Sequence, residues 1–170
     1  MLPSHPILWV PPAEFRLAVL GTQNQGKSTV QDDQNAFLGQ IEDLSEKDGR
    51  YKSTAYLFVY AALEYLVRKL NRDHSGTPDG RHVTGQELSL GIADYAREQF
   101  GPMARAVFDH WGIHATVDFG HIVYNLIAAE LMNKTEEDSL DDFRDVYNFD
   151  QMFDPKRIQQ FPDKLDLELM

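Results

Sequence analysis

The sequence predicts a mainly α-helical protein, a compact bundle of about five helices. Apolar residues recur at helical spacing along most of the chain between residues 35 and 132. Helix start and stop signals separate these segments, and only one short run, 17–20, has the character of a β-strand. With 170 residues, of which 42% are hydrophobic, the chain is long enough to form one ordinary core. We expect an N-terminal extension at 1–34, a helical domain at 35–153 and a loose C-terminal tail at 154–170.

The first two predicted helices differ in how much of their surface is apolar. Apolar residues within 37–44 recur on one face of the first helix, which closes near Gly49. Ser53 or Thr54 can cap the second helix, which runs to about Leu70 and is apolar on nearly every face. A helix of that kind is buried on all sides, so we expect it at the centre of the bundle.

Turn and capping residues mark the next boundaries. Residues 71–81 have the composition of a loop. Thr84 and Glu87 are spaced as a capping box, in which each side chain accepts a hydrogen bond from the backbone N–H of the other residue. This box predicts the start of a helix that ends at Gly101, and Pro102 can occupy the first turn of the following helix.

Two helices are predicted on either side of a glycine. The first covers 103–111 and is ended by Gly112. Thr116 or Asp118 can cap the second, whose apolar residues continue to Met132. We therefore expect a long apolar helix after the turn at Gly112.

The segment 140–153 leaves two structures open, a helix or a short β-ribbon. With a ribbon at 143–149, the helices at 102–111 and 118–132 would form a winged-helix-like C-terminal part. The second helix of a DNA-reading unit presents Arg, Lys or Asn to the groove, whereas residues 124–130 are apolar and acidic. A winged-helix-like DNA-binding regulator is therefore the least favoured function, and we expect such a unit to bind protein.

Charge and composition exclude several classes of partner. The formal net charge is -11 and the pI is about 4.8, which disfavours nucleic acid and anionic membrane surfaces as partners. The chain has no cysteine, which excludes disulfides, thiolate metal sites and cysteine nucleophiles. No apolar run approaches the ~20 residues needed to cross a bilayer. We expect a cytoplasmic protein that does not enter membranes.

A phosphate-binding motif lies near the N-terminus. Gly21, Gly26, Lys27 and Ser28 match GxxxxGK[ST], a pattern whose backbone N–H groups, lysine and serine hold the phosphates and Mg²⁺ of ATP or GTP. The surroundings are atypical, because the helix after the motif begins with the polar segment 31–35 and few strands are available for a parallel sheet. Nucleotide binding is therefore kept as the alternative function, and otherwise no cofactor is expected.

No catalytic or metal site is predicted. His110 and His114 have the spacing of a metal-binding pair on a helix, but Gly112 between them interrupts that helix. No serine, histidine and aspartate order and no carboxylate pair can be singled out by spacing. These observations favour a protein that is not an enzyme.

The acidic segment near the C-terminus carries the leading functional hypothesis. Acidic residues of 136–154 are offset only by Arg144, and aromatic residues alternate with them. The simplest interpretation is a solvated acidic face. The functional interpretation is a docking surface for a basic protein partner, which would make the chain a non-enzymatic interaction or regulatory module. The residues proposed for this surface are Glu137, Asp141, Asp142, Phe143, Asp145, Tyr147 and Phe149.

A set of distinctive strings lies between about residues 37 and 153. They are Gly49-Arg-Tyr51, Ala55-Tyr-Leu-Phe-Val59, Ala62-Leu-Glu-Tyr65, Arg81-His-Val-Thr-Gly-Gln-Glu87, Gln99-Phe-Gly-Pro-Met-Ala-Arg105, His110-Trp-Gly112, Asp118-Phe-Gly120, Ile122-Val-Tyr-Asn-Leu126, Lys134-Thr-Glu-Glu-Asp-Ser139, Asp142-Phe143 and Asp145-Val-Tyr147. In these strings the chain resembles a small uncharacterised bacterial protein family found mainly in planctomycetes and verrucomicrobia. The resemblance implies no activity, cofactor or catalytic residue, because that family has none assigned. It does not reach residues 21–29, which weakens the nucleotide interpretation.

Overall fold

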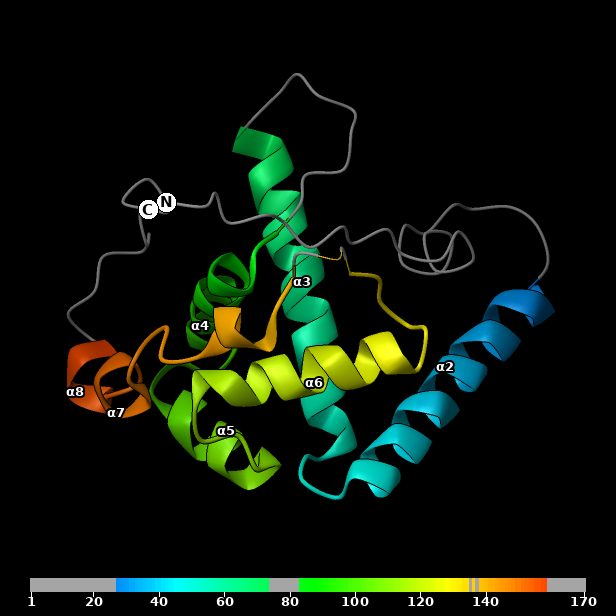
Figure 1. Cartoon of the computed structure of the whole chain (residues 1–170), viewed down its shortest axis with the longest axis horizontal. Coiled ribbons are helices and arrows are strands. Elements are labelled where there is room, and N and C mark those ends of the chain that lie inside the picture. The colour runs from blue at the N-terminus through cyan, green and yellow to red at the C-terminus, as the bar shows by residue number, and fades with distance from the viewer. Residues whose placement is uncertain (1–26, 74–82, 135, 137, 159–170) are drawn as a thin grey trace.

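The structure is a computed structural model that describes residues 27–73, 83–134, 136 and 138–158 (Figure 1). Within these residues the chain is helical and contains no β-sheet. Five helices have eight or more residues, which confirms the predicted mainly α-helical bundle. The elements, in chain order, are α2 (Lys27–Asp48), α3 (Ser53–Asp73), α4 (Gly85–Phe100), η1 (Gly101–Met103), α5 (Ala104–Trp111), α6 (Thr116–Ala128), η2 (Leu140–Phe143), α7 (Phe149–Met152) and α8 (Pro155–Ile158).

Helix α3 is the centre of the bundle, as its apolar surface predicts. It contacts α2, α4, α5 and α6, and Figure 1 shows it running through the middle of the fold. Tyr56, Val59 and Leu63 are fully or almost fully buried along its length. Burial of a helix on several sides supplies most of the apolar contact that stabilises a domain of this size.

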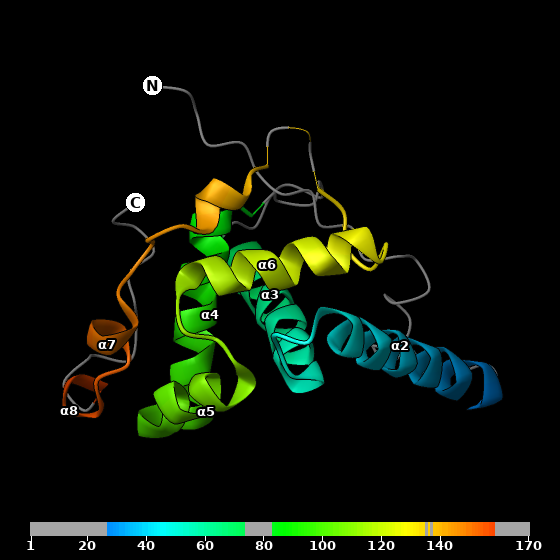
Figure 2. The ribbon, with the colours of Figure 1, turned by 60° about the horizontal axis from the view of Figure 1, so that its bottom comes forward.

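Helix α2 lies at the edge of the fold. Phe37 and Ile41 bury one face against α3, and Leu38 remains exposed. Towards its N-terminus α2 diverges from the other helices (Figure 2). It begins at Lys27 and so extends into the segment 1–34 that was expected to be an extension, while residues 1–26 lie outside the described residues.

The predicted capping box at the start of α4 is confirmed. The Glu87 N–H donates to Thr84 Oγ1 at 3.1 Å, and the Thr84 N–H donates to Glu87 Oε2 at 2.9 Å. Helix α4 ends at Phe100, before Gly101 as predicted. The predicted loop at 71–81 is described only to residue 73, which is still part of α3.

Helix α6 is shorter than predicted. It ends at Ala128, not near Met132, and Glu130 adopts a left-handed φ of 59°. The Leu131 N–H then donates to the Leu126 carbonyl at 2.9 Å, which closes the helix end. Leu131 and Met132 are buried beneath this turn. The prediction that they belong to the helix is wrong.

The short β-ribbon that is one of the two structures predicted for 140–153 is not formed. The described chain there consists of η2, turns and α7. Phe143 is the reason, because its buried ring approaches both α4 at Gly85 and α6 at Gly120, where neither residue carries a Cβ. This packing fixes the segment against two helices. The predicted winged-helix-like unit is therefore not formed, because it lacks the β-ribbon that would be its wing.

The C-terminal end of the described chain is helical. Residues 155–158 form α8 at the start of the segment expected to be a loose tail, and 159–170 lie outside the described residues. Among the helices that the structure describes, none is both long and apolar enough to cross a membrane.

Candidate functional site

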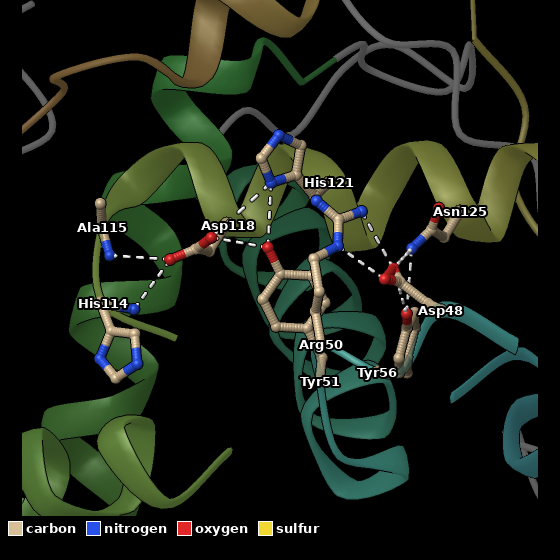
Figure 3. Close-up of polar contacts among 9 residues, drawn as sticks. All are labelled: Asp48, Arg50, Tyr51, Tyr56, His114, Ala115, Asp118, His121 and Asn125. Atoms are coloured by element: carbon tan, nitrogen blue, oxygen red, sulfur yellow. Dashed lines mark hydrogen bonds and ion pairs between the residues drawn. The ribbon is translucent and has the colours of Figure 1, made fainter. Parts of the chain in front are cut away.

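Seven polar and aromatic residues form a connected group where the loop between α2 and α3 meets α6 (Figure 3). We call this group the corner network. It brings together side chains that are far apart in the sequence. Its members are Asp48, Arg50, Tyr51, Tyr56, Asp118, His121 and Asn125.

Backbone hydrogen bonds fix the loop that carries Arg50 and Tyr51. The hydroxyl of Ser45 donates to the Tyr51 carbonyl at 2.7 Å. On the other side of the loop, the Lys52 N–H donates to the Trp111 carbonyl at 3.2 Å. The loop is therefore held by α2 and by the C-terminus of α5, which gives its side chains a defined position against α6.

Tyr51 links α6 to this loop through two contacts. Its hydroxyl lies 2.6 Å from Asp118 Oδ1 and 2.9 Å from His121 Nδ1. The other carboxylate oxygen, Asp118 Oδ2, accepts the backbone N–H groups of His114 at 2.8 Å and Ala115 at 3.0 Å. The N-cap residue of α6 is Ala115, and not Thr116 or Asp118 as predicted. Asp118 accepts the N-cap N–H from the first turn of α6 and also receives the tyrosine hydroxyl.

With an ionised Asp118 and a neutral His121, the contacts of Tyr51 assign the proton of each group. An ionised carboxylate can only accept, so the single hydroxyl proton of Tyr51 is donated to Asp118. The phenol oxygen is then free to accept from Nδ1–H of His121. A neutral His121 in this tautomer keeps an unprotonated Nε2, on the side of the ring away from Tyr51 (Figure 3).

The other half of the corner network is centred on Asp48. Its carboxylate accepts from Nε of Arg50 at 2.6 Å and from Nη2 at 3.0 Å, a bidentate arrangement. Asn125 donates to Asp48 and also, at 3.0 Å, to the hydroxyl of Tyr56. The Arg50 guanidinium carbon lies 5.2 Å from the centre of the Tyr51 ring, which joins the two halves.

Burial and pairing shift the ionisation of three members. The hydrogen bond from Arg50 holds the pKa of Asp48 below its ordinary value. Burial raises the pKa of Tyr51, and the hydrogen bond to Asp118 adds to this shift. Burial also raises the pKa of Tyr56. At neutral pH the network therefore consists of an ionised Asp48 and two protonated phenols.

The aromatic residues of the predicted docking surface belong to the core. Phe143 and Phe149 are 1% and 4% exposed, and the Tyr147 hydroxyl donates to the Ser89 carbonyl at 2.8 Å. The expectation that Phe143 and Phe149 offer anchors to a partner is therefore wrong, because their rings are already packed within this chain. The rings that surround Phe149 are those of Phe108, Phe119, Tyr147 and Phe153.

The acidic residues of the same segment have the opposite placement. Asp141 and Asp145 are exposed, whereas Asp142 is half-buried and accepts the Ser139 N–H at 3.2 Å. Arg144 pairs with Asp141 at 2.7 Å. Glu137 lies outside the described residues. The structure thus separates the two components of the predicted surface, with carboxylates outside and rings inside.

The phosphate-binding motif is only partly within the described chain. Gly21 and Gly26 lie outside it, and Lys27 and Ser28 are the first two residues of α2. The backbone of these two residues is therefore helical.

The histidines do not form a metal site within the described residues, where no group of three metal-ligating side chains is found. Nδ1 of His114 lies 3.1 Å from Asp109 Oδ1, and His121 joins Tyr51. His110 is exposed near the end of α5.

Sequence reasoning treated Asp118 as a helix cap and His121 as one of several nearby histidines, and joined neither to Tyr51. A usable signal was present in α6. Residues 118, 121 and 125 are polar and lie on one face of a helix that is otherwise strongly apolar. Such a polar stripe predicts a buried or half-buried hydrogen-bond network, although it does not identify the residues on the other side.

Comparisons of this chain with protein-family models, with curated proteins and with solved structures found no match. Membership of the bacterial family named above stays a prediction. Function has to be argued from the surfaces and sites of the chain itself.

Proposed function

We propose that this chain is a non-enzymatic interaction module that binds a basic segment of a partner protein. The surface proposed for this role is the acidic ridge, which we define as the exposed carboxylates of Asp141, Asp145 and Asp150. The observation that carries the proposal is the separation just described. Buried rings hold the segment in place, while its carboxylates face solvent.

Rigidity and charge both favour binding by the ridge. The side chains of Asp141 and Asp150 are 79% and 83% exposed, so they face a partner without rearrangement of the backbone. Each already pairs with an arginine of this chain, Arg144 and Arg105, and a basic partner would compete with these two surface ion pairs. Because buried aromatic side chains order the segment before binding, little conformational entropy remains to be lost. The net charge of -11 adds a long-range attraction for a basic partner, which chiefly raises the association rate.

The experiment compares two variants that each remove three negative charges. The test variant is Asp141→Asn, Asp145→Asn and Asp150→Asn, and the control variant is Glu42→Gln, Asp43→Asn and Glu46→Gln on the exposed part of α2. Asparagine suits position 145 because it tolerates the left-handed φ of 49° found there.

We expect the test variant to weaken binding of an immobilised lysine- and arginine-rich peptide by roughly tenfold or more, and the control variant to weaken it much less. Surface-plasmon resonance at two salt concentrations measures both effects, and binding should fall as salt increases. Equal losses in the two variants would show that only net charge matters and would overturn the assignment of the ridge.

A second candidate is Mg²⁺-dependent binding of ATP or GTP through Gly21, Gly26, Lys27 and Ser28. It is favoured by the helical conformation of Lys27 and Ser28, because the lysine and serine of phosphate-binding loops belong to the helix that follows the loop. If it is correct, saturating nucleotide at about 100 times Kd should stabilise the protein by about 2.7 kcal/mol. Lys27→Ala should remove this stabilisation, measured as the shift in melting temperature. A melting temperature that does not respond to millimolar nucleotide would eliminate this candidate.

A further inference from the structure

Two residues that contact Tyr51 each keep a polar group available in the corner network. Arg50 uses Nε and Nη2 for Asp48, so its two Nη1 hydrogens have no partner among the described residues. Nε2 of His121 likewise makes no hydrogen bond within the described part of the chain. Both residues lie against the same ring, since the ring centres of Tyr51 and His121 are 6.4 Å apart and the Arg50 guanidinium also packs on Tyr51.

The two groups reach solvent from a fixed framework. The Arg50 side chain is 52% exposed and the His121 side chain is 27% exposed. Figure 3 shows the guanidinium of Arg50 between His121 and Asp48. Its position is set by the bidentate pair with Asp48, and the His121 ring is set by Tyr51. Arg50 therefore offers a donor group and His121 an acceptor atom, and each side chain is held in place by its own hydrogen bonds.

The neighbouring carboxylates are already engaged by donors. Asp48 accepts from Arg50, Tyr56 and Asn125. Asp118 accepts from Tyr51 and from two backbone N–H groups. Because these hydrogen bonds disperse the carboxylate charge, they reduce its repulsion of a bound anion at this position.

From this arrangement we infer that Arg50 and His121 bind a small oxyanion that still carries a proton, such as hydrogen phosphate or hydrogencarbonate. Nη1–H of Arg50 donates to an anionic oxygen, and the protonated oxygen of the ligand donates to the unprotonated Nε2 of His121. Sulfate has no proton at neutral pH, so it leaves Nε2 without a donor. The inference goes beyond the acidic ridge and does not depend on it.

The first measurement is the tautomer of His121. A long-range ¹H–¹⁵N NMR spectrum of the neutral ring should show the proton on Nδ1. A ring protonated on Nε2 would overturn the inference, because that nitrogen would then donate to any oxyanion and could not select one that bears a proton.

The second measurement is an NMR titration at about pH 8, where histidine is ordinarily neutral, with phosphate and sulfate at matched ionic strength. We expect phosphate to shift the signals of Arg50 and His121 with an affinity roughly three- to tenfold higher than that of sulfate, as one hydrogen bond allows. Hydrogencarbonate and methyl phosphate provide two further arms. Hydrogencarbonate should bind, whereas methyl phosphate, which has lost its proton at this pH, should resemble sulfate.

Two variants locate the effect. His121→Phe, which keeps a ring but has no acceptor, should abolish the preference for phosphate over sulfate. The matched variant His114→Phe should retain it, since His114 pairs with Asp109 outside the network. Arg50→Gln should weaken the binding of both anions. Equal affinity of the wild-type protein for phosphate and sulfate, or a preference that survives His121→Phe, would overturn the inference even if Arg50→Gln failed to fold.

Discussion

Replacing Gly112 with alanine is expected to lower the free energy of unfolding by about 3 kcal/mol, from two costs that act together. Gly112 ends α5 with a φ of 84°, a left-handed conformation that an L side chain rarely adopts. A Cβ built at this position would lie 2.3 Å from the Arg50 carbonyl oxygen, so the backbone of the α2–α3 loop would have to move. Urea denaturation of the purified variant measures the loss.

Two other glycines separate these costs. Gly49 also has a left-handed φ, 75°, but a Cβ there would meet nothing within 4 Å. Gly49→Ala should therefore cost only about 1 kcal/mol, the conformational part alone. Gly39 lies within α2 and also has open space, so Gly39→Ala should stabilise the protein by up to about 1 kcal/mol. A Gly112→Ala variant as stable as Gly49→Ala would show that the contact with Arg50 is not rigid.

Local signals were sufficient to predict most helix boundaries. The capping box at Thr84 and the glycines at 101 and 112 act on the backbone within one turn, so their effect can be read from neighbouring residues. The predicted end of α6 is wrong because no such local signal marks it. Leu131 and Met132 continue the apolar pattern, and only burial beneath the turn at Glu130 distinguishes them from a further helical turn.

The corner network could not be assembled from the sequence because its contacts are not local. Tyr51 meets Asp118 and His121 across 67 and 70 positions, and Asn125 meets Asp48 across 77. The polar face of α6 predicts that hydrogen-bond partners exist. Which residues these partners are depends on how α3 places the α2–α3 loop. A pattern within one helix carries no information about that placement.

The acidic segment shows a different limit of sequence reasoning. Aromatic residues among charged residues can either contact a partner or pack into the core of their own chain. Both arrangements give a segment of the same amino-acid composition. The structure selects the second for Phe143 and Phe149. The surface proposed for a partner is therefore the acidic ridge alone. A charged surface of this kind favours fast, salt-sensitive binding over a tight apolar contact.

Truncation of Phe108 to alanine is expected to cost about 3–5 kcal/mol, the range for a fully buried phenylalanine. Phe108 is 0% exposed, and its ring centre lies 5.7 Å from Phe58 of α3, 5.6 Å from Phe119 of α6 and 5.2 Å from Phe153. The substitution therefore opens a cavity where three parts of the fold meet, and the edge-to-face rings around it leave little freedom for it to collapse. Thermal and urea unfolding both measure this cost.

The same substitution connects stability to the acidic ridge. Phe108→Leu retains most of the volume and should cost about 1.5 kcal/mol or less, and Met103→Ala, at a side chain 66% exposed, should change stability by less than about 0.5 kcal/mol. Because Phe149 and Phe153 lose a packing partner in Phe108→Ala, the segment carrying Asp150 should loosen and binding of the basic peptide should weaken at a temperature where the variant is still folded. Undiminished binding by a destabilised, folded Phe108→Ala variant would show that the aromatic cluster stabilises the fold without ordering the ridge.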